Sequence, residues 1–445
     1  MPGGMRALVA GATLAIAAGG CARARLTPEP PPARAMRLRE FRRVVDSMVT
    51  APAFRNANWG VLIADPAAGD TLYSRNAGKL FMPASNEKLL TGSTALTQLG
   101  ADFRFTTRFA TAGTVADGAL HGDLVVLGTG DPTFSDTLQG GDFRNAFRAM
   151  ADSVAARGIS RIEGMLVRGG PAFTDGECGY GWELDDLEEP YGACVNELFV
   201  NEGYARVPRG DGDTSATRVV AIRDPRGAFF AALGDALRDR GVAFAGVADS
   251  ARVVPDSGLT TLFTIASPPL PVILARMLKP SQNQIAELLF KTLGRVKGGA
   301  GRADSARQVV ERQLVAWGAD PEGFAVRDGS GMSRHDYVSP ETLVRVLAAM
   351  RRGPDAATWY ASLPVAGEPG TLETRMLGTA AEHNVHAKTG TVDKARSLSG
   401  YVTTADGRTL VFSFLCNNFT VPTRDVERVQ DAILALLAAR PRPIR

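Results

Sequence analysis

The segment FMPASNEKLL, residues 81–90, decides the fold prediction. It holds the single S-x-x-K pattern of the chain, Ser85 and Lys88, and residues three apart on a helix share one face. A buried lysine can lose its proton and act as a base toward the hydroxyl, while a helix N-terminus supplies free N–H groups beside it. The structural alternatives are an N-capping serine and a solvated lysine. Because the chain has only seven lysines, an accidental match is expected in roughly a third of such chains.

Two further motifs follow in order along the chain. Lys388-Thr389-Gly390-Thr391 contains the only K-T-G and is expected to open a strand; an accidental K-T-G is expected in roughly one chain in twenty. Lysine and threonine together can hold a carboxylate, and Gly390 would let a substrate backbone approach the strand edge. Ser281-Gln282-Asn283 is an S-x-N at a helix start, where a hydroxyl and an amide could relay a proton and orient the lysine.

Other nucleophile systems have little support. No serine occupies G-x-S-x-G, and the four histidines (121, 335, 383 and 386) leave few candidates for a Ser-His-Asp triad. The S-x-N motif is weak evidence alone, since residues 74–76 also match it and an N-capping serine explains Ser281 equally well. The three motifs in this order favour serine–lysine chemistry.

Length and composition describe an ordinary globular protein. The 445 residues suggest about three domain-sized units. The hydrophobic share of 45% excludes a disordered chain. Lys+Arg 50 against Asp+Glu 47 argues against a nucleic-acid binder.

The N-terminal residues predict export. Residues 7–18 form an apolar run that is too short to cross a bilayer, and small residues follow it, so residues 1–21 are interpreted as a signal peptide. Cys21 lies where a bacterial lipoprotein carries its lipid; plain cleavage is the alternative. Residues 22–35 are Pro-rich and are interpreted as a linker. The expected location is extracytoplasmic, in the periplasm or cell envelope, with a possible lipid anchor to the membrane.

The remaining cysteines and histidines predict no metal site. Cys178 and Cys194 lie 16 residues apart in a polar loop, where an oxidising compartment would allow a disulfide; two reduced thiols are the alternative. Cys416 is expected to be a buried small hydrophobe. His383 and His386 are expected in a solvated loop without a third ligand. We expect no metal and no cofactor.

The pattern of elements predicts an α+β fold. Helices are expected over residues 36–49, 86–99, 143–157, 228–240, 271–279, 285–293, 303–317, 340–351 and 425–439, and strands over 58–64, 71–74, 124–128, 161–168, 218–222, 397–403 and 409–416. Helices early and antiparallel hairpins late suggest an antiparallel sheet flanked by helices. Residues 36–100 and 262–445 would form this domain, and 101–261 an inserted, mostly β region of one or two small modules.

The ordered motifs resemble those of the penicillin-recognising serine enzymes. The long gap between Ser85 and Ser281, and segments 82–85, 128–132, 181–191, 267–270, 328–334 and 370–372, are similar to the D-Ala-D-Ala carboxypeptidase/endopeptidase family of low-molecular-mass class C penicillin-binding proteins, peptidase family S13. The resemblance covers about residues 38 to 440. Gln282 departs from the usual Asp and Pro280 from a usual polar residue; since the middle residue points away in the family, little effect is expected.

The resemblance implies a DD-peptidase/β-lactamase-like domain that cleaves peptidoglycan stem peptides through an acyl-enzyme and is inhibited covalently by β-lactams. Ser85 would attack the penultimate D-Ala carbonyl with Lys88 as base, and the backbone N–H groups of Ser85 and Thr391 would form the oxyanion hole. Ser281, Asn283 and Lys388 would complete the proton network. Lys388, Thr389 and Thr391 would bind the terminal carboxylate.

The resemblance also implies a recognition loop for the amino end of the third stem residue. It maps to Asp186 and Tyr191, with Trp182 and Val392 nearby; Asp185 is an equal-looking neighbour, and a solvated acidic turn is the structural alternative. Two rival functions stay open on the same fold. One is a β-lactam hydrolase or D-amino esterase, and the other is a non-catalytic cell-wall-binding protein.

Overall fold

A computed structural model describes residues 37–209 and 217–440. The predicted signal peptide, the linker and Cys21 lie outside these residues. Within them, no helix combines the length and the apolar character that crossing a membrane requires.

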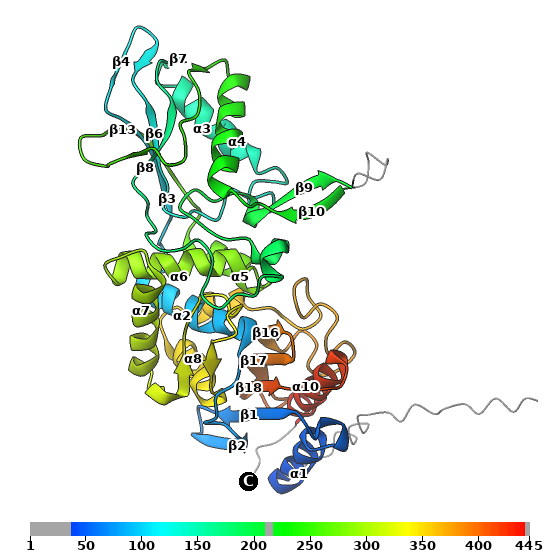
Figure 1. Ribbon diagram of the computed structural model, residues 1–445. Helices are drawn as coiled ribbons and strands as arrows, with labels where there is room; N and C mark the ends of the chain where they lie inside the picture. The colour runs from blue at the N-terminus through cyan, green and yellow to red at the C-terminus, as the bar shows by residue number, and fades with distance from the viewer. Residues whose placement is uncertain (1–36, 210–216, 441–445) are drawn as a thin grey trace, which may run out of the picture.

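A five-stranded antiparallel sheet organises the lower part of the molecule in Figure 1. Its order is β16-β17-β18-β1-β2, so β16 is an edge strand. The bounds are His386–Val392, Ala395–Thr403, Thr409–Asn417, Asn58–Asp65 and Asp70–Arg75. Helices α1 (Leu38–Val49) and α10 (Thr423–Ala438) share one buried apolar cluster with this sheet.

A helical layer shares the second apolar cluster with the sheet. It comprises α2 (Glu87–Leu99), α5 (Leu270–Leu278), α6 (Asn283–Lys297), α7 (Ala303–Ala316), α8 (Pro340–Arg352) and α9 (Ala356–Ser362). Strands β14 (Phe324–Ala325) and β15 (Tyr337–Val338) pair with each other and come between α7 and α8 in the chain. Side chains alternate along β1, so Val61 and Ile63 pack in one cluster and Leu62 in the other. The sheet is therefore buried on both faces.

The strands between residues 106 and 266 pair only among themselves in the described chain and form a second lobe. One sheet has the order β12-β8-β6-β3-β13 (Val253–Val254, Leu166–Gly169, Leu124–Leu127, Thr106–Thr111, Thr260–Ala266). Another has the order β11-β7-β5-β4 (Ala243–Phe244, Arg161–Ile162, Ala119–His121, Thr114–Ala116), and β9 (Tyr204–Pro208) pairs with β10 (Thr217–Ala221). Helices α3 (Arg144–Ala155) and α4 (Pro225–Asp239) contribute to the core of this lobe.

The predicted α+β class is confirmed, and several local details differ. The predicted strand over 161–168 is two strands, β7 and β8, separated at Glu163–Met165. Helix α9 was not predicted, because seven residues give too short a periodic pattern. β13 reaches Ala266, past the predicted boundary at 261, because it pairs with β3. His386 was wrongly expected in a solvated loop: it opens β16 and its ring stacks on Tyr360 at 3.8 Å between centroids.

Candidate active site

The segment around Ser85 forms a tight turn directly before helix α2. Residues Ala84–Asn86 form a 3₁₀ turn ahead of α2, and Ala84 has φ 48°, a left-handed value that costs an L-residue energy. Ser397 Oγ donates to Pro83 O at 2.6 Å, and Asn86 Nδ2 donates to Lys388 O at 2.8 Å. These bonds attach the turn to the sheet, so Ser85 is held beside β16.

Gly390 permits this attachment, for a reason that differs from the sequence interpretation. A Cβ at Gly390 would lie 2.0 Å from Ser397 Oγ and 2.5 Å from Pro83 O. The missing side chain therefore faces the turn that carries Ser85, and Gly390 is not among the described residues that line the cavity. The absence of a side chain at Gly390 therefore permits the packing behind Ser85.

Lys88 Nζ is the centre of the polar network. It lies 2.9 Å from Ser85 Oγ and 2.6 Å from Asn283 Oδ1. It also donates to Ser330 O at 2.7 Å. The Lys88 side chain is fully buried, and this burial lowers its pKa from the ordinary value to about 7, against the opposing influence of nearby carboxylates.

These three contacts suit a neutral lysine. Asn283 Nδ2 donates to Tyr191 O at 2.9 Å, which directs its Oδ1 toward Lys88. Oδ1 and the Ser330 carbonyl can only accept, so they take both N–H groups of a neutral amine. In the neutral form the lone pair of Nζ faces Ser85 Oγ, whose hydroxyl can then donate to it, whereas protonated Lys88 donates to Ser85 Oγ. The arrangement can remove a proton from Ser85.

Ser281 and Lys388 occupy different positions around this network. Ser281 precedes α6, has φ 66° and lines the same cavity as Ser85. Gln282 caps α6 by accepting from Ile285 N at 2.9 Å and does not line the cavity in the described chain. Lys388 is fully buried, and its Nζ donates to Thr389 O at 2.9 Å. Burial and the neighbouring Lys88 hold the pKa of Lys388 well below its usual range.

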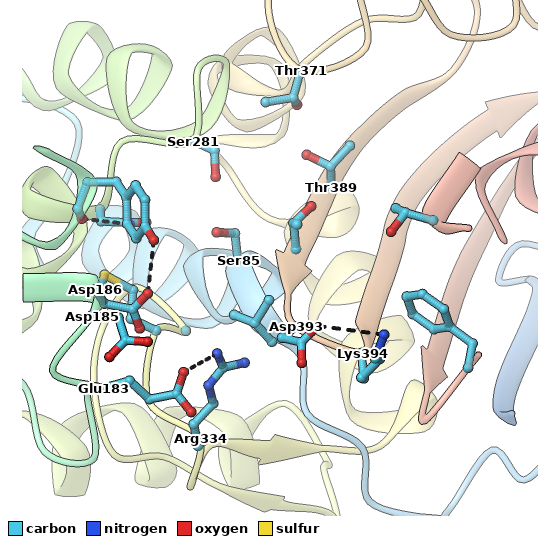
Figure 2. A pocket seen from close by; sticks show the side chains of 18 of the residues that line it. Ser85, Glu183, Asp185, Asp186, Ser281, Arg334, Thr371, Thr389, Asp393 and Lys394 are labelled. Carbon is cyan, nitrogen blue, oxygen red and sulfur yellow. Dashed lines mark hydrogen bonds and ion pairs between the residues drawn. The ribbon is translucent and has the colours of Figure 1, made fainter. Parts of the chain in front are cut away.

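A cavity of about 820 Å³ opens over Ser85. Thr389, Thr391 and Val392 of β16 and its end form one wall. Glu183, Asp185 and Asp186 line the opposite side, as Figure 2 shows, with Ser85 and Ser281 between the two walls. The cavity therefore has a strand edge on one side and an acidic surface on the other.

The acidic wall is braced by hydrogen bonds and a disulfide. Tyr191 Oη donates to Asp186 Oδ1 at 3.0 Å, and burial together with this bond raises the pKa of Tyr191 to about 12. Cys178 and Cys194 are joined by a disulfide that closes the loop. Arg334 pairs with Glu183 at 2.6 Å. The disulfide therefore closes the ends of the loop 178–194, and the Arg334–Glu183 ion pair holds the part that lines the cavity.

Trp182 has a different place from the other predicted recognition residues. Its indole Nε1 donates to Asp328 Oδ2 at 2.8 Å, and it is absent from the described lining of the cavity. Asp328 also accepts from the backbone N–H groups of Ser330, Gly331 and Ser333. Asp328 thus shapes the turn that presents the Ser330 carbonyl to Lys88.

Glu183, Arg334 and Thr371 also line the cavity, although the sequence motifs indicate no role for them. The density of Gly, Ser and Asp in 328–334 is a turn pattern and could have drawn attention to that loop. Among the described residues, no group of three or more His, Cys, Asp or Glu could hold a metal ion.

Comparisons with known proteins agree on one family. The model of the D-Ala-D-Ala carboxypeptidase 3 (S13) family matches residues 41–221 and 207–440. The chain is 33% identical to a D-alanyl-D-alanine carboxypeptidase of Actinomadura sp. (strain R39), over 90% of this chain and 85% of that protein. It is 24% identical to the D-alanyl-D-alanine carboxypeptidase DacB of Haemophilus influenzae, over 84% of this chain and 86% of that protein.

Solved structures share the fold. Penicillin-binding protein 4 of Haemophilus influenzae superposes with a TM-score of 0.75 at 22% identity, covering 88% of this chain and 97% of that chain. A predatory endopeptidase of Bdellovibrio bacteriovorus superposes with a TM-score of 0.57 at 21% identity, covering 87% and 96%.

Proposed function

The chain belongs to the D-Ala-D-Ala carboxypeptidase 3 (S13) family, and from this premise we propose that Ser85 is its acylating nucleophile. The protein is a serine-type D-Ala-D-Ala carboxypeptidase/endopeptidase, a penicillin-binding hydrolase of peptidoglycan peptides that works through an acyl-enzyme. The observation that carries the assignment of Ser85 is the 2.9 Å contact between its Oγ and Lys88 Nζ at the floor of the cavity.

The proposed acylation step uses these contacts. Neutral Lys88 takes the Ser85 hydroxyl proton while Oγ forms a bond to the penultimate D-Ala carbonyl carbon. The backbone N–H groups of Ser85 and Thr391 stabilise the negative oxygen. The C–N bond then breaks, and the departing D-Ala amine receives a proton through Lys88 and Ser281. Water releases the acyl group from Ser85 in the second half of the reaction.

The neighbouring residues position the lysine and the substrate. Asn283 accepts one Lys88 N–H and thereby directs the lone pair of Nζ toward Ser85. Thr389 and Thr391 would hold the terminal carboxylate at the edge of β16, with Lys388 buried behind them and bonded to the Thr389 carbonyl. Asp186 and Tyr191 would recognise an ammonium group on the third stem residue, with Val392 beside it. Trp182 would act indirectly, through its bond to Asp328.

The domain organisation and the cellular location of the enzyme belong to the same proposal. Residues 36–100 and 267–445 would form the catalytic domain, with residues 101–266, through the end of β13, as an insertion whose loop 178–194 reaches the cavity. The enzyme would act outside the cytoplasm, exported by residues 1–21, with Cys21 as the candidate for lipid attachment and plain cleavage as the alternative.

Intact-mass spectrometry after benzylpenicillin treatment tests the nucleophile. Wild-type protein and the Ser47→Ala control, which changes an exposed serine on α1, should gain a stable penicilloyl mass. The Ser85→Ala variant should gain none, and an adduct on that variant would disprove the assignment. A fleeting wild-type adduct with steady penicillin consumption would instead indicate a β-lactam hydrolase. No adduct on wild type would indicate a non-catalytic wall-binding protein.

A further inference from the structure

The cavity extends beyond the residues that the reaction uses. Past the end of β16 it is lined by Asp393 and Lys394, and by the segment 419–423 that leads from β18 into α10. Figure 2 shows Asp393 and Lys394 on the side of Ser85 away from Ser281. The proposed mechanism gives none of these residues a role.

The direction of a bound peptide follows from the proposed contacts on β16. In the proposed mode the terminal carboxylate would lie at Thr389 and the scissile carbonyl oxygen at the N–H of Thr391. The peptide would therefore run antiparallel to β16, with its C-terminus near residue 389 and its preceding residues toward residue 391. Because an edge strand pairs with an extended peptide, the preceding peptide residues continue toward Val392 and Lys394.

Lys394 belongs to the two-residue turn that follows β16, because Val392 pairs directly with Ala395 across that turn. The turn lies at the end of the strand edge, and its two residues line the same cavity as Thr391 and Val392. Two extended peptide residues reach roughly 7 Å from the Thr391 N–H. The four-carbon stem of lysine lets the ammonium group of Lys394 reach back from the turn toward a peptide residue at that distance.

Lys394 is also the cation of this cavity that lacks a close partner in the described chain. Arg334 is bound to Glu183 at 2.6 Å, whereas the nearest carboxylate to Lys394 Nζ is that of Asp393 at 4.0 Å. Both side chains of the latter pair are more than half exposed, and such pairs contribute little. The ammonium group of Lys394 is available to an incoming carboxylate.

The backbone holds Lys394 in an unfavourable conformation at this place. Its φ is 54°, in the left-handed region that costs a lysine about 1 kcal/mol or more. Asn418 N donates to Lys394 O at 2.8 Å, which fixes the turn to the segment before Phe419. The exposed side chain thus projects from an anchored backbone, as a binding residue requires.

We propose that Lys394, with the apolar wall of Phe419 and Val421, forms a subsite for a carboxylate on the residue two positions before the acylated one. The inference rests on the proposed function and extends its substrate class. The cavity then recognises two charges of the stem peptide, an ammonium group at Asp186 and a carboxylate at Lys394. Lys394 is a specificity-determining residue and takes no part in bond making.

Paired peptides test the subsite. Two substrates are compared that end in D-Ala-D-Ala and differ only in a carboxylate or a carboxamide on the residue two positions before the acylated one. Lys394→Gln should lower kcat/KM for the carboxylate peptide by about fivefold, through KM, and should leave the carboxamide peptide within twofold. Lys394→Arg should retain the preference. Lys79→Gln, at an exposed lysine away from this cavity, is the matched control.

Any other pattern of activity on the two peptides contradicts the proposed subsite. Equal losses on both peptides would indicate a structural effect of the Lys394 turn, and no loss on either would exclude contact with the carboxylate. Penicillin acylation of the variant separates this inference from the proposed function. If wild type and Lys394→Gln acylate at equal rates while neither distinguishes the two peptides, the subsite fails and the nucleophile assignment stands.

Discussion

Glu87 lies next to Lys88 in the chain, and its protonation state has a measurable consequence for the proposed reaction. Its side chain is fully buried, and neither carboxylate oxygen has a hydrogen-bond partner among the described residues. Burial, followed by the nearby Asp328 and Glu287, raises the pKa of Glu87 well above its ordinary value. Burial likewise raises the pKa of Glu287 to about 8. We therefore expect Glu87 to be a neutral acid at neutral pH, where it adds no negative charge beside Lys88.

The size of the effect follows from the Lys88 pKa of about 7. The neutral fraction of Lys88 is about 10/11 at pH 8 and about 1/11 at pH 6, so acylation should fall about tenfold between them as Lys88 becomes protonated. Glu87→Gln replaces a neutral acid by a neutral amide of equal size. The midpoint of the acid limb should therefore stay within about 0.3 pH units.

The assay is the single-turnover acylation rate with benzylpenicillin across the pH range, for wild type, Glu87→Gln and a control. Glu341→Gln serves as the control, because Glu341 is an exposed carboxylate on α8 that pairs with Arg345. Two opposite unit charges roughly 7 Å apart interact by about 2 kcal/mol at an effective dielectric constant of about 20, which is the scale expected for an ionised Glu87 acting on Lys88. Removal of that charge would lower the midpoint by more than about one pH unit, and that result would refute a neutral Glu87.

Two further substitutions test the walls of the cavity. Gly390→Ala should reduce penicillin acylation at least about a hundredfold and lower the thermal midpoint, because the Pro83 carbonyl at 2.5 Å cannot retreat without moving Ser85. Gly170→Ala, where a Cβ meets nothing within 4 Å, should be tolerated in both measurements, and an equally active Gly390→Ala would contradict the packing role. Asp186→Asn should lower kcat/KM about tenfold for peptides with a free amine on the third residue and leave the N-acetylated peptides unchanged. Glu188→Gln is its control, and equal cleavage of both peptides by wild type would exclude this recognition.

The sequence by itself determined the class of the fold and the pairing of Ser85 with Lys88. Ser85 and Lys88 are three residues apart, so a helix start alone brings them together, and local spacing is sufficient to predict the pair. Hydrophobic periodicity located the long helices and the hairpin of β17 and β18, because an amphipathic pattern depends only on residues close together in the sequence. The assignment of the family rested on the same local motifs.

Only the tertiary structure decided how the lysine is held. The acceptors of Lys88 lie on Asn283 and Ser330, 195 and 242 residues away in the chain, and no local pattern specifies such contacts. The same applies to Gly390, whose neighbours at Pro83 and Ser397 come from other elements. Burial, which sets the protonation of Lys88 and Glu87, is a property of the assembled core. Neighbouring residues determine the local structure, whereas desolvation and long-range contacts exist only after the chain has folded.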